Sequence, residues 1–512
     1  MKGIVKHLFA GLLLVSLLVS CTHTPTPDGE LLISETQLRM NVGDMESLML
    51  LTGGKIIDNN EASWVSTNPE AASVTAGIVE AKSAGKTTIK ATYKEMSVQC
   101  VVIVESAEDL SAAVCYLRKS SKRGVSYSFN QFPHEDVATL APFISWCYNW
   151  GSQPSSAEIS NLLDNAQIEY IPMAWNGVNE AQIRAYKQSH PECEYILAFN
   201  EPNLRDQANM TPQQAAEKWP ALKNLADELG LKIVSPAMNY GTLAGYSDPV
   251  KWLDEFFTLV PKTDMCAIAL HCYMAGAGAM YEFIHRFEKY GMPIWMTEFC
   301  AWDKPAPGSV SAQIDYMNEA VIMMEAEPMV ERYAWFIPRG NGAVDSYPYM
   351  QLLSKTDIGA LSPQGEVYAG LTSLDKVTWL PSSAPILPNT YSNCSAAESI
   401  KNGSYEAAMH LQPTTDNSGV LMMTGFITGK WVEYQIDVVT DVNTMVLRYE
   451  GVTGSKLTIS VDGEEKTQVS VPWTENRWDT MEIDLPVSAG HHVVRLAVDG
   501  HIYYNWFKFV NK

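Results

Sequence analysis

The sequence has no surplus of positive charge. Among its 512 residues, 58 Asp and Glu outnumber 36 Lys and Arg, and the formal net charge is -22 at pH 7. A chain without a basic surplus is a poor partner for nucleic acid. Hydrophobic residues make up 46% and charged residues 18%, which is typical of a globular protein. The length exceeds one ordinary core, so about two to four domains are expected.

The sequence also lacks the cysteine patterns of zinc sites and redox motifs. It contains nine Cys, with no CxxC pair and no zinc-ligand spacing. Cys147, Cys266, Cys272 and Cys300 lie within apolar, strand-like runs. We therefore expect them to be small buried hydrophobic residues, although export would permit disulfides.

No hydrophobic run is long enough for a comfortable membrane span. The longest N-terminal run, 8–19, follows Lys2 and ends just before Cys21, which indicates a signal peptide over residues 1–20. Its end resembles a bacterial lipobox, which implies a lipidated Cys21 and a cell-envelope lipoprotein at the outer membrane or cell surface. An ordinary signal peptide or a short membrane helix with a chance Cys are the alternatives. Residues 21–30 form a polar, Pro-rich tether.

Residues 31–105 read as all-β, with short alternating runs between Gly, Asn and Ser turns. The stretch "ASWVSTNPEAASVTAGIVEAKSAGKTTIKATY", which contains Trp64, Gly77 and Gly85, resembles the bacterial Ig-like group 2 domain. Such domains are usually spacers, and no polar cluster indicates another role.

Residues 120–378 alternate strand and helix. Eight strand-like runs are followed by helical segments, such as the one that starts at Thr211-Pro212 and ends at Gly230. Eight such units in this length predict a (β/α)8 TIM barrel. A doubly wound sheet is disfavoured because no glycine-rich phosphate loop follows the first strand.

Residues 397–512 are again all-β and predict a second β-sandwich, a jelly roll. Residues 379–396 are rich in Pro and Ser, and we expect a linker there that packs poorly.

In a TIM barrel, the C-terminal ends of the strands face the active-site mouth. The fourth strand ends in Asn200-Glu201 and the seventh in Glu298. The remaining polar and aromatic strand-end residues are Tyr148, Asn149, Trp150, Trp175, Asn176, His271, Tyr273 and Trp335. Two carboxylates among Trp rings and amide donors predict glycoside hydrolysis, in which one carboxyl protonates the leaving oxygen and the other attacks or activates water. The alternative is that one Glu caps a helix and the other pairs with a Lys or Arg.

Six motifs along the barrel resemble those of glycoside hydrolase family 128, of clan A. They are "KRGVSYSFN", "CYNWGS", "FNEPNLRDQANMTPQQAAEKWP", "VSPAMN", "HCYM" and "PIWMTEFCAW". The resemblance runs through essentially the whole barrel. It implies metal-free hydrolysis of β-1,3-glucan with retention of configuration. By this resemblance Glu201 is the acid/base, Glu298 the nucleophile, and Asn200 a ligand of the sugar 2-hydroxyl.

The resemblance also implies supporting residues. His271 and Tyr273 support the site, and Tyr273 is expected to hydrogen-bond Glu298. The preferred sugar contacts are Trp150, Trp175 and Trp335. Further candidates are Trp302, Gln207, Asn209, and Trp146 and Trp295, for which burial within the strands is at least as well supported.

The last domain resembles carbohydrate-binding module family 6, through "YEAAMHLQ", "GKWVEYQIDV", "LTISVDGEE" and "YYNWFKF". The resemblance implies sugar contacts at Trp478, Tyr503 and Asn505, with Trp473 and Tyr504 as further loop candidates. A sandwich that has lost its sugar site is the alternative. Tyr405 and Glu406 match an opening motif associated with structural calcium, but Ala408 stands where a second acid is common. No other cofactor is expected.

Together these features predict a lipid-anchored, endo-acting, retaining β-1,3-glucanase whose partners are a polysaccharide and a membrane. Two alternatives stay open. One is a β-glycanase of another linkage specificity, and the other is a surface glycan-binding lipoprotein without catalysis.

Overall fold

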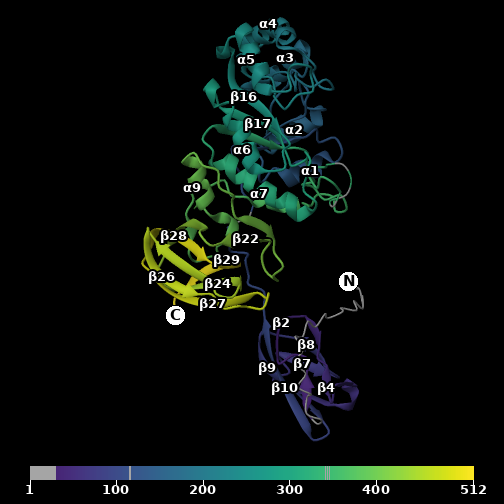
Figure 1. The fold of residues 1–512 in the computed structure, drawn as a ribbon, viewed down its shortest axis with the longest axis vertical. Helices are drawn as coiled ribbons and strands as arrows, with labels where there is room; N and C mark the ends of the chain where they lie inside the picture. Colours follow the sequence, from purple (N-terminus) through teal and green to yellow (C-terminus); the bar gives the residue numbers. More distant parts are fainter. Residues whose placement is uncertain (1–29, 115–116, 341, 343, 345) are drawn as a thin grey trace. The chain divides into compact units, whose positions relative to one another are not determined.

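The computed structural model describes residues 30–114, 117–340, 342, 344 and 346–512 (Figure 1). The chain forms two compact units, one that ends at Glu108 and one from Asp109 to Lys512. The signal peptide, Cys21 and the tether up to residue 29 lie outside the described residues.

The first unit is an all-β domain, as expected for an Ig-like fold. Buried Leu38, Val79, Ile89, Cys100 and Val102 form its core. Its three sheets have the orders β2-β10-β9-β6, β1-β4-β5 and β3-β8-β7. The bounds are β1 Leu31–Ile33, β2 Gln37–Asn41, β3 Met45–Ser47, β4 Leu50–Thr52, β5 Lys55–Ile57, β6 Ser63–Ser66, β7 Ala72–Thr75, β8 Ile78–Ala81, β9 Gly85–Tyr93 and β10 Met96–Glu105.

The second unit begins with an eight-stranded parallel sheet that curls into a barrel. Its order is β13-β12-β11-β18-β17-β16-β15-β14, and a parallel bridge between Met173 and Leu197 joins the two ends. The TIM-barrel prediction is confirmed, with all eight strand-like runs in place. The bounds are β11 Arg123–Ser126, β12 Trp146–Tyr148, β13 Glu169–Tyr170, β14 Tyr195–Leu197, β15 Lys232–Val234, β16 Met265–Cys272, β17 Ile294–Phe299 and β18 Val330–Trp335.

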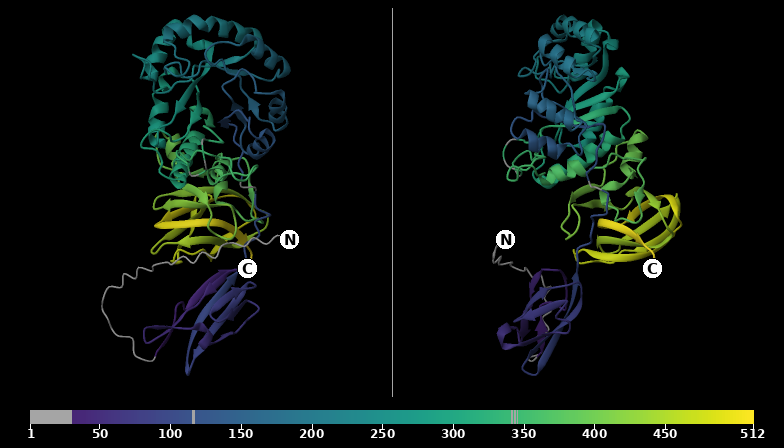
Figure 2. Two further views of the ribbon diagram at one scale, coloured as in Figure 1. Left: turned by 90° about the vertical axis from the view of Figure 1, so that its right-hand side faces the viewer. Right: turned by 180° about the vertical axis from the view of Figure 1, so that it is seen from behind.

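Helices surround these strands (Figure 2). In α4 the Thr211 side chain accepts from the Gln214 N–H, Gln214 returns the bond, and Gly230 ends the helix at φ +67°. This agrees with the start and stop expected from the sequence. The bounds are α1 Pro133–Leu140, α2 Ala157–Asn165, α3 Glu180–Ser189, α4 Pro212–Leu229, α5 Pro249–Leu259, α6 Ala277–His285, α7 Val310–Ala326 and α8 Pro363–Gly370.

The barrel interior below the mouth is filled by large aromatic residues. Trp146 and Trp295 are fully buried there, with ring centroids 5.8 Å apart, and Arg332 stacks on the Trp295 ring at 4.5 Å. These two Trp are therefore core residues, the alternative that the sequence supported at least as well as sugar contact.

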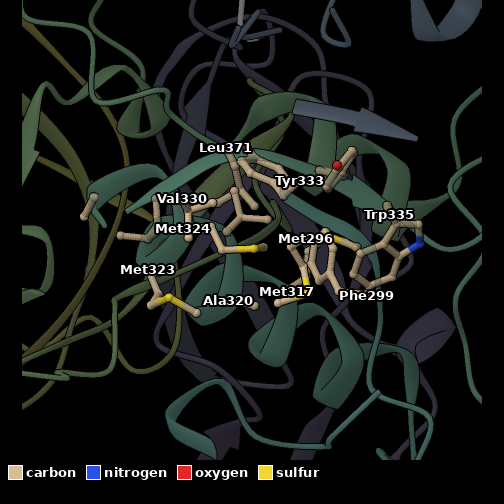
Figure 3. Close-up of a cluster of buried hydrophobic side chains, with 14 of the residues drawn as sticks. Met296, Phe299, Met317, Ala320, Met323, Met324, Val330, Tyr333, Trp335 and Leu371 are labelled. Carbon is tan, nitrogen blue, oxygen red and sulfur yellow. The ribbon is translucent and has the colours of Figure 1, made fainter. Parts of the chain in front are cut away.

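A second core lies between β17, β18 and α7 (Figure 3). Trp335 belongs to it: the side chain is fully buried, packs edge-on against Phe299 at 5.1 Å, and donates from Nε1 to the Met350 carbonyl oxygen at 2.8 Å. The expectation that Trp335 contacts sugar is therefore corrected. Its side chain points outward from the barrel, toward the helices.

The chain then forms a two-sheet β-sandwich. One sheet has the order β19-β23-β28-β25-β26, with β20 on β23, and the other β21-β22-β29-β24-β27. The bounds are β19 Leu380–Pro381, β20 Asn393–Cys394, α9 Ser395–Lys401, β21 His410–Pro413, β22 Leu421–Ile427, β23 Trp431–Val438, β24 Val442–Gly451, β25 Lys456–Val461, β26 Glu464–Ser470, β27 Asp479–Val487, β28 Gly490–Asp499 and β29 His501–Val510.

Residues 379–396 do not behave as the poorly packed linker that their composition predicts. β19 and β20 both pair with β23, and Ile386 exchanges backbone hydrogen bonds with Phe507. Leu380, Ile386 and Tyr391 are at most 2% exposed. The Pro and Ser residues are accommodated because the segment runs along sheet edges, where a missing N–H is tolerated.

Helix α7 of the barrel is also the main contact with the sandwich. The buried Asn318 side chain donates to the Leu411 carbonyl oxygen at 3.0 Å and accepts from the Leu411 N–H at 2.7 Å. Beside this pair, His410 lies between Asp315 and Glu319, at 3.0 and 3.2 Å. The barrel and the sandwich therefore share a specific, hydrogen-bonded interface.

Within the residues that the structure describes, no helix has the length and apolar character needed to cross a membrane.

The charge of His410 gives a first prediction. Burial lowers its pKa, but hydrogen bonds to Asp315 and Glu319 outweigh that effect and raise the pKa to about 9 from 6.5. A raised pKa means that the stabilisation is complete below about pH 6.5 and is lost as the pH rises through about 9. We expect His410→Gln to lower the free energy of unfolding by about 1–3 kcal/mol at pH 6. At pH 10.5 the difference should largely disappear.

Thermal unfolding of the wild type and the variant at both pH values measures this. His134→Gln is the matched control, because His134 and Glu158 form an exposed pair at 2.8 Å. An equal loss for His410→Gln at both pH values would contradict the charge-based account.

Candidate active site

Glu201 lies four residues beyond the end of β14, at the barrel mouth, and its backbone conformation is unusual. Its φ is +43°, a left-handed conformation that is uncommon for a residue with a side chain. The loop behind it is fixed by backbone bonds from Ala208 to Asn200 and from Met210 to Pro202. The strand thus ends in a rigid turn that presents a 6% exposed carboxylate.

Glu298 lies on β17 and is held by three neutral donors. Tyr148 donates from its hydroxyl to Oε1 at 2.8 Å, Trp150 donates from Nε1 to the same oxygen at 2.7 Å, and Tyr273 donates to Oε2. The hydrogen bond expected between Tyr273 and Glu298 is confirmed. Three donors compensate the buried carboxylate for the water that it has lost.

Glu201 has a different environment. Its Oε1 accepts from Asn239 at 3.1 Å and contacts His271 Nδ1 at 2.9 Å, whereas its Oε2 has no hydrogen-bond partner among the described residues. Burial raises the pKa of Glu201, but His271 and Asn239 more than offset this and lower it. One oxygen is thus held by the protein, and the other remains available to a substrate.

His271 connects the two carboxylates. It is fully buried, and its Nδ1 lies 2.9 Å from Glu201 and 3.4 Å from Glu298. Burial lowers its pKa, but the charges of Glu298 and Glu201 raise it above 6.5. The Nε2 atom is buried without a partner. Whether the imidazole or Glu201 carries the proton of this pair, the net charge is the same, so the two groups titrate together.

The three side chains are close enough to act on one bond. One ligand atom from each of Glu201, His271 and Glu298 lies within 4.8 Å of the others. By residue type the cluster could also hold a cation, but a hydrogen bond between His271 Nδ1 and Glu201 already accounts for their 2.9 Å contact. One oxygen of each carboxylate lies within 4.8 Å of the other, and this arrangement suits proton transfer by one carboxyl group and nucleophilic attack by the other.

A cavity of about 600 Å³ opens over these residues. Both glutamates line it, so a bound polymer reaches both carboxylates. The remaining lining residues are Trp150, Trp175, Asn200, Leu204, Gln207, Asn239, Tyr273, Trp302, Asp303, Phe336 and Ile337.

The structure brings most of the expected residues to this cavity. Trp150, Trp175, Asn200 and Tyr273 line it, and His271 lies buried beneath it. Gln207 also lines the cavity and accepts from Asn200 at 3.1 Å. Of the preferred catalytic and sugar-binding residues of the barrel, Trp335 is the one placed elsewhere, and among the further candidates Asn209 does not line the cavity.

Several lining or supporting residues were missed by sequence reasoning. Asn239 holds Glu201 but follows an irregular strand end, and Tyr148 was noted only as a strand-end residue. The sequence ranked Trp302 below Trp150, Trp175 and Trp335 as a sugar contact, although Trp302 borders the cavity. Asp303 and Phe336 carried no motif. Strand parity could have found Phe336, because Ala334 faces the barrel interior and side chains alternate.

The expected sugar contacts of the sandwich differ in their exposure to solvent. Trp478 and Tyr503 are partly exposed. Asn505 is fully buried, and its amide donates to Asp416 at 2.9 Å and to the Ser418 carbonyl oxygen at 2.5 Å. Asp416 in turn pairs with Arg448 at 2.7 Å. Asn505 therefore holds the loop above it and is not presented to a ligand.

Glu406, the acid of the opening motif, already has a cationic partner. The Lys430 ammonium lies 2.7 Å from Oε1 of Glu406 and 2.5 Å from the Ala407 carbonyl oxygen, and Ser399 donates to Oε2. The Lys430 ammonium group thus supplies the positive charge that a calcium ion would bring to this motif.

Comparison with known families agrees with this division. Residues 124–368 match the family described as "Glycosyl hydrolase catalytic core", and residues 33–104 match "Bacterial Ig-like domain (group 2)". Residues 403–509 match "Carbohydrate binding module (family 35)". The C-terminal domain is therefore a carbohydrate-binding module, and family 35 replaces the family 6 suggested by the sequence features.

Solved and curated relatives cover the barrel. An endo-β-1,3-glucanase of family 128 (subgroup II) from Pseudomonas viridiflava is 35% identical, over 49% of this chain and 98% of that chain, with a TM-score of 0.44. Its counterpart from Sorangium cellulosum is 30% identical, over 48% and 97%, with a TM-score of 0.42. Alkali-sensitive linkage protein 1 of Schizosaccharomyces pombe is 27% identical over 261 residues, and this chain spans 44% of its length.

The barrel, the paired carboxylates and the family match define the class of protein: it is a glycoside hydrolase. More particularly, its catalytic core is carried with an Ig-like group 2 domain and a carbohydrate-binding module in one chain.

Proposed function

We propose that the protein hydrolyses β-1,3-glucan with retention of configuration and cleaves within the chain. The observation that carries the proposal is the unequal setting of two carboxylates within 4.8 Å. In retaining enzymes the two carboxyl groups lie about 5–5.5 Å apart, which leaves no room for a water between nucleophile and sugar.

The two environments assign the roles. Glu298, whose two oxygens accept from Tyr148, Trp150 and Tyr273, is the nucleophile that attacks the anomeric carbon. Glu201 protonates the departing glycosidic oxygen through Oε2, the oxygen without a protein partner. In the second half-reaction Glu201 takes a proton from water, and that water releases the sugar from Glu298.

The choice of β-1,3-glucan is supported by the 35% and 30% identity to endo-β-1,3-glucanases across nearly their full length. An open cavity of about 600 Å³ with Trp150, Trp175 and Trp302 on its walls supports binding of a polymer.

The direct test compares the wild type with Glu298→Gln on laminarin. We expect release of reducing sugar by the wild type and a loss of about 10⁴-fold or more in the variant, because the amide cannot form the glycosyl ester. Glu282→Gln, an exposed acid on α6, is the control and should be as active as the wild type. Equal release by Glu298→Gln would remove the assignment, and activity only on xylan or mannan would indicate another linkage.

The Glu201–His271 pair predicts the pH dependence. The alkaline limb of kcat/KM reports loss of the proton that the pair shares, and the raised pKa of His271 places that limb above pH 6.5. In His271→Asn the amide still donates to Glu201, but the more basic group is gone. The alkaline limb should therefore move to lower pH. Rates on laminarin from pH 4 to 10 measure this, and a limb that stays or moves upward would contradict the shared proton.

We further propose that the chain is a lipoprotein of the cell envelope, anchored through Cys21. The support is the charged start, the short apolar run and the Ser20-Cys21 junction. Cys21→Ser should move the protein from the membrane fraction to the soluble fraction without loss of laminarin hydrolysis. Persistence in the membrane fraction would contradict the lipid anchor.

A further inference from the structure

A second acidic residue lines the cavity without taking part in the mechanism. Trp302 and Asp303 follow β17, and the backbone N–H groups of both donate to the Tyr273 carbonyl oxygen, at 2.9 and 2.8 Å. Tyr273 also donates its hydroxyl to Glu298. The residue that holds the nucleophile therefore also fixes the position of Asp303.

The Asp303 carboxylate is not satisfied by the protein. It lines the same cavity as the two glutamates, and no described residue donates a hydrogen bond to it or pairs with its charge. The side chain is exposed to the open cavity, although partial burial raises its pKa. A sugar that binds there displaces the water around the carboxylate, so the position favours a ligand that brings hydrogen-bond donors of its own. Sugar hydroxyls are such donors.

The neighbouring aromatic residues shape the space beside Asp303. The Trp302 ring packs edge-on against Tyr273, with centroids 6.1 Å apart, and lies 5.8 Å from Phe336. Both Trp302 and Phe336 line the cavity. A glucosyl unit that reacts at Glu298 therefore meets an apolar wall with one carboxylate at its edge.

The barrel order decides which hydroxyls face that carboxylate. Asp303 follows β17 and Asn200 follows β14, and these strands are three positions apart in the order β17-β16-β15-β14. The two residues therefore reach the mouth from strands that are well separated around the barrel. A pyranose whose 2-hydroxyl faces Asn200 turns its 4- and 6-hydroxyls toward the Asp303 side.

We propose that Asp303 is a specificity residue that accepts hydrogen bonds from the 4- and 6-hydroxyls of the glucosyl unit bound over Glu298. This rests on the proposed β-1,3-glucanase function. In a β-1,3-linked chain both hydroxyls are free, because the linkage uses positions 1 and 3. In a β-1,4-linked chain the 4-oxygen is part of the linkage and cannot donate, which leaves the carboxylate half-satisfied. A 6-O-branched unit loses the other donor and adds bulk.

The test measures kcat/KM of Asp303→Asn and Asp303→Ala on laminarihexaose. The matched control is Asp206→Asn, an exposed acid in the loop after β14 that does not line the cavity. We expect Asp303→Ala to lower kcat/KM by about 10- to 100-fold, the range for a lost hydrogen bond to a charged group. Asp206→Asn should stay within about twofold. The melting temperature of Asp303→Asn should not fall, because Asp303 has no protein partner to lose.

Two further measurements separate recognition from catalysis. Calorimetric binding of laminarihexaose should be about tenfold weaker in Glu298→Gln/Asp303→Asn than in Glu298→Gln alone. On a β-1,6-branched β-1,3-glucan, the wild type should leave the branched units uncleaved, and the preference for linear over mixed-linkage glucan should shrink in Asp303→Asn.

The outcomes are distinguishable. If Asp303→Asn has the same kcat/KM and the same affinity as the wild type, the role of Asp303 is overturned and the proposed function stays intact. A wild type that does not cleave laminarihexaose would overturn both. Loss of activity together with a lower melting temperature in both Asp303 variants would assign Asp303 to structure, against the proposal.

Discussion

The structure depends on keeping two carboxylates and an imidazole together in a nearly dry pocket. Glu201 and Glu298 are 6% and 4% exposed, and His271 is fully buried. Like charges at this distance repel strongly in a medium of low dielectric constant, and each loses hydration. The cluster exists because donors from several strands are directed at it. β12 supplies Tyr148, β16 supplies His271, and Tyr273 and Asn239 come from the segments that follow β16 and β15.

The two carboxylates are compensated unequally by their hydrogen-bond donors, and this difference allows them to play different chemical roles. All the partners of Glu201 converge on one of its oxygens, whereas both oxygens of Glu298 accept from hydroxyl and indole groups. Two residues of the same type therefore differ in what they can do: one keeps an oxygen without a protein partner, and the other is oriented by hydrogen bonds at both oxygens. The left-handed backbone at Glu201 contributes to this arrangement, because the strained turn after β14 directs the carboxylate into the barrel mouth.

Much of this could be read from the sequence, because strand ends of a parallel barrel converge on one edge whatever the details of packing. Glu201 and Glu298 followed from that rule. The rule says where along the strand a residue lies, but not which face of the strand its side chain takes. The prediction that Trp335 contacts sugar fails for this reason. Ala334 faces the interior, so Trp335 faces the helices and Phe336 the cavity. Asn239 and Asp303 lie beyond the strands, in turns that only the folded chain positions. Residues 379–396 were misjudged because their burial comes from pairing with β23, a long-range contact that composition does not encode.

The interface between barrel and sandwich gives the binding module a fixed relation to the catalytic site. Asn318 of α7 is bonded at both its donor and its acceptor to Leu411, and the buried cores of the two domains form one continuous cluster. A module on a flexible tether raises the local substrate concentration in any direction, whereas a module in a rigid unit helps only those chains that reach both sites at once. Asn505 is occupied by Asp416 and Ser418, whereas Trp478 and Tyr503, the other two predicted sugar contacts of this module, are partly exposed. A rigid arrangement of this kind favours polymers whose path fits two sites at once, in addition to any preference for the linkage that is cut.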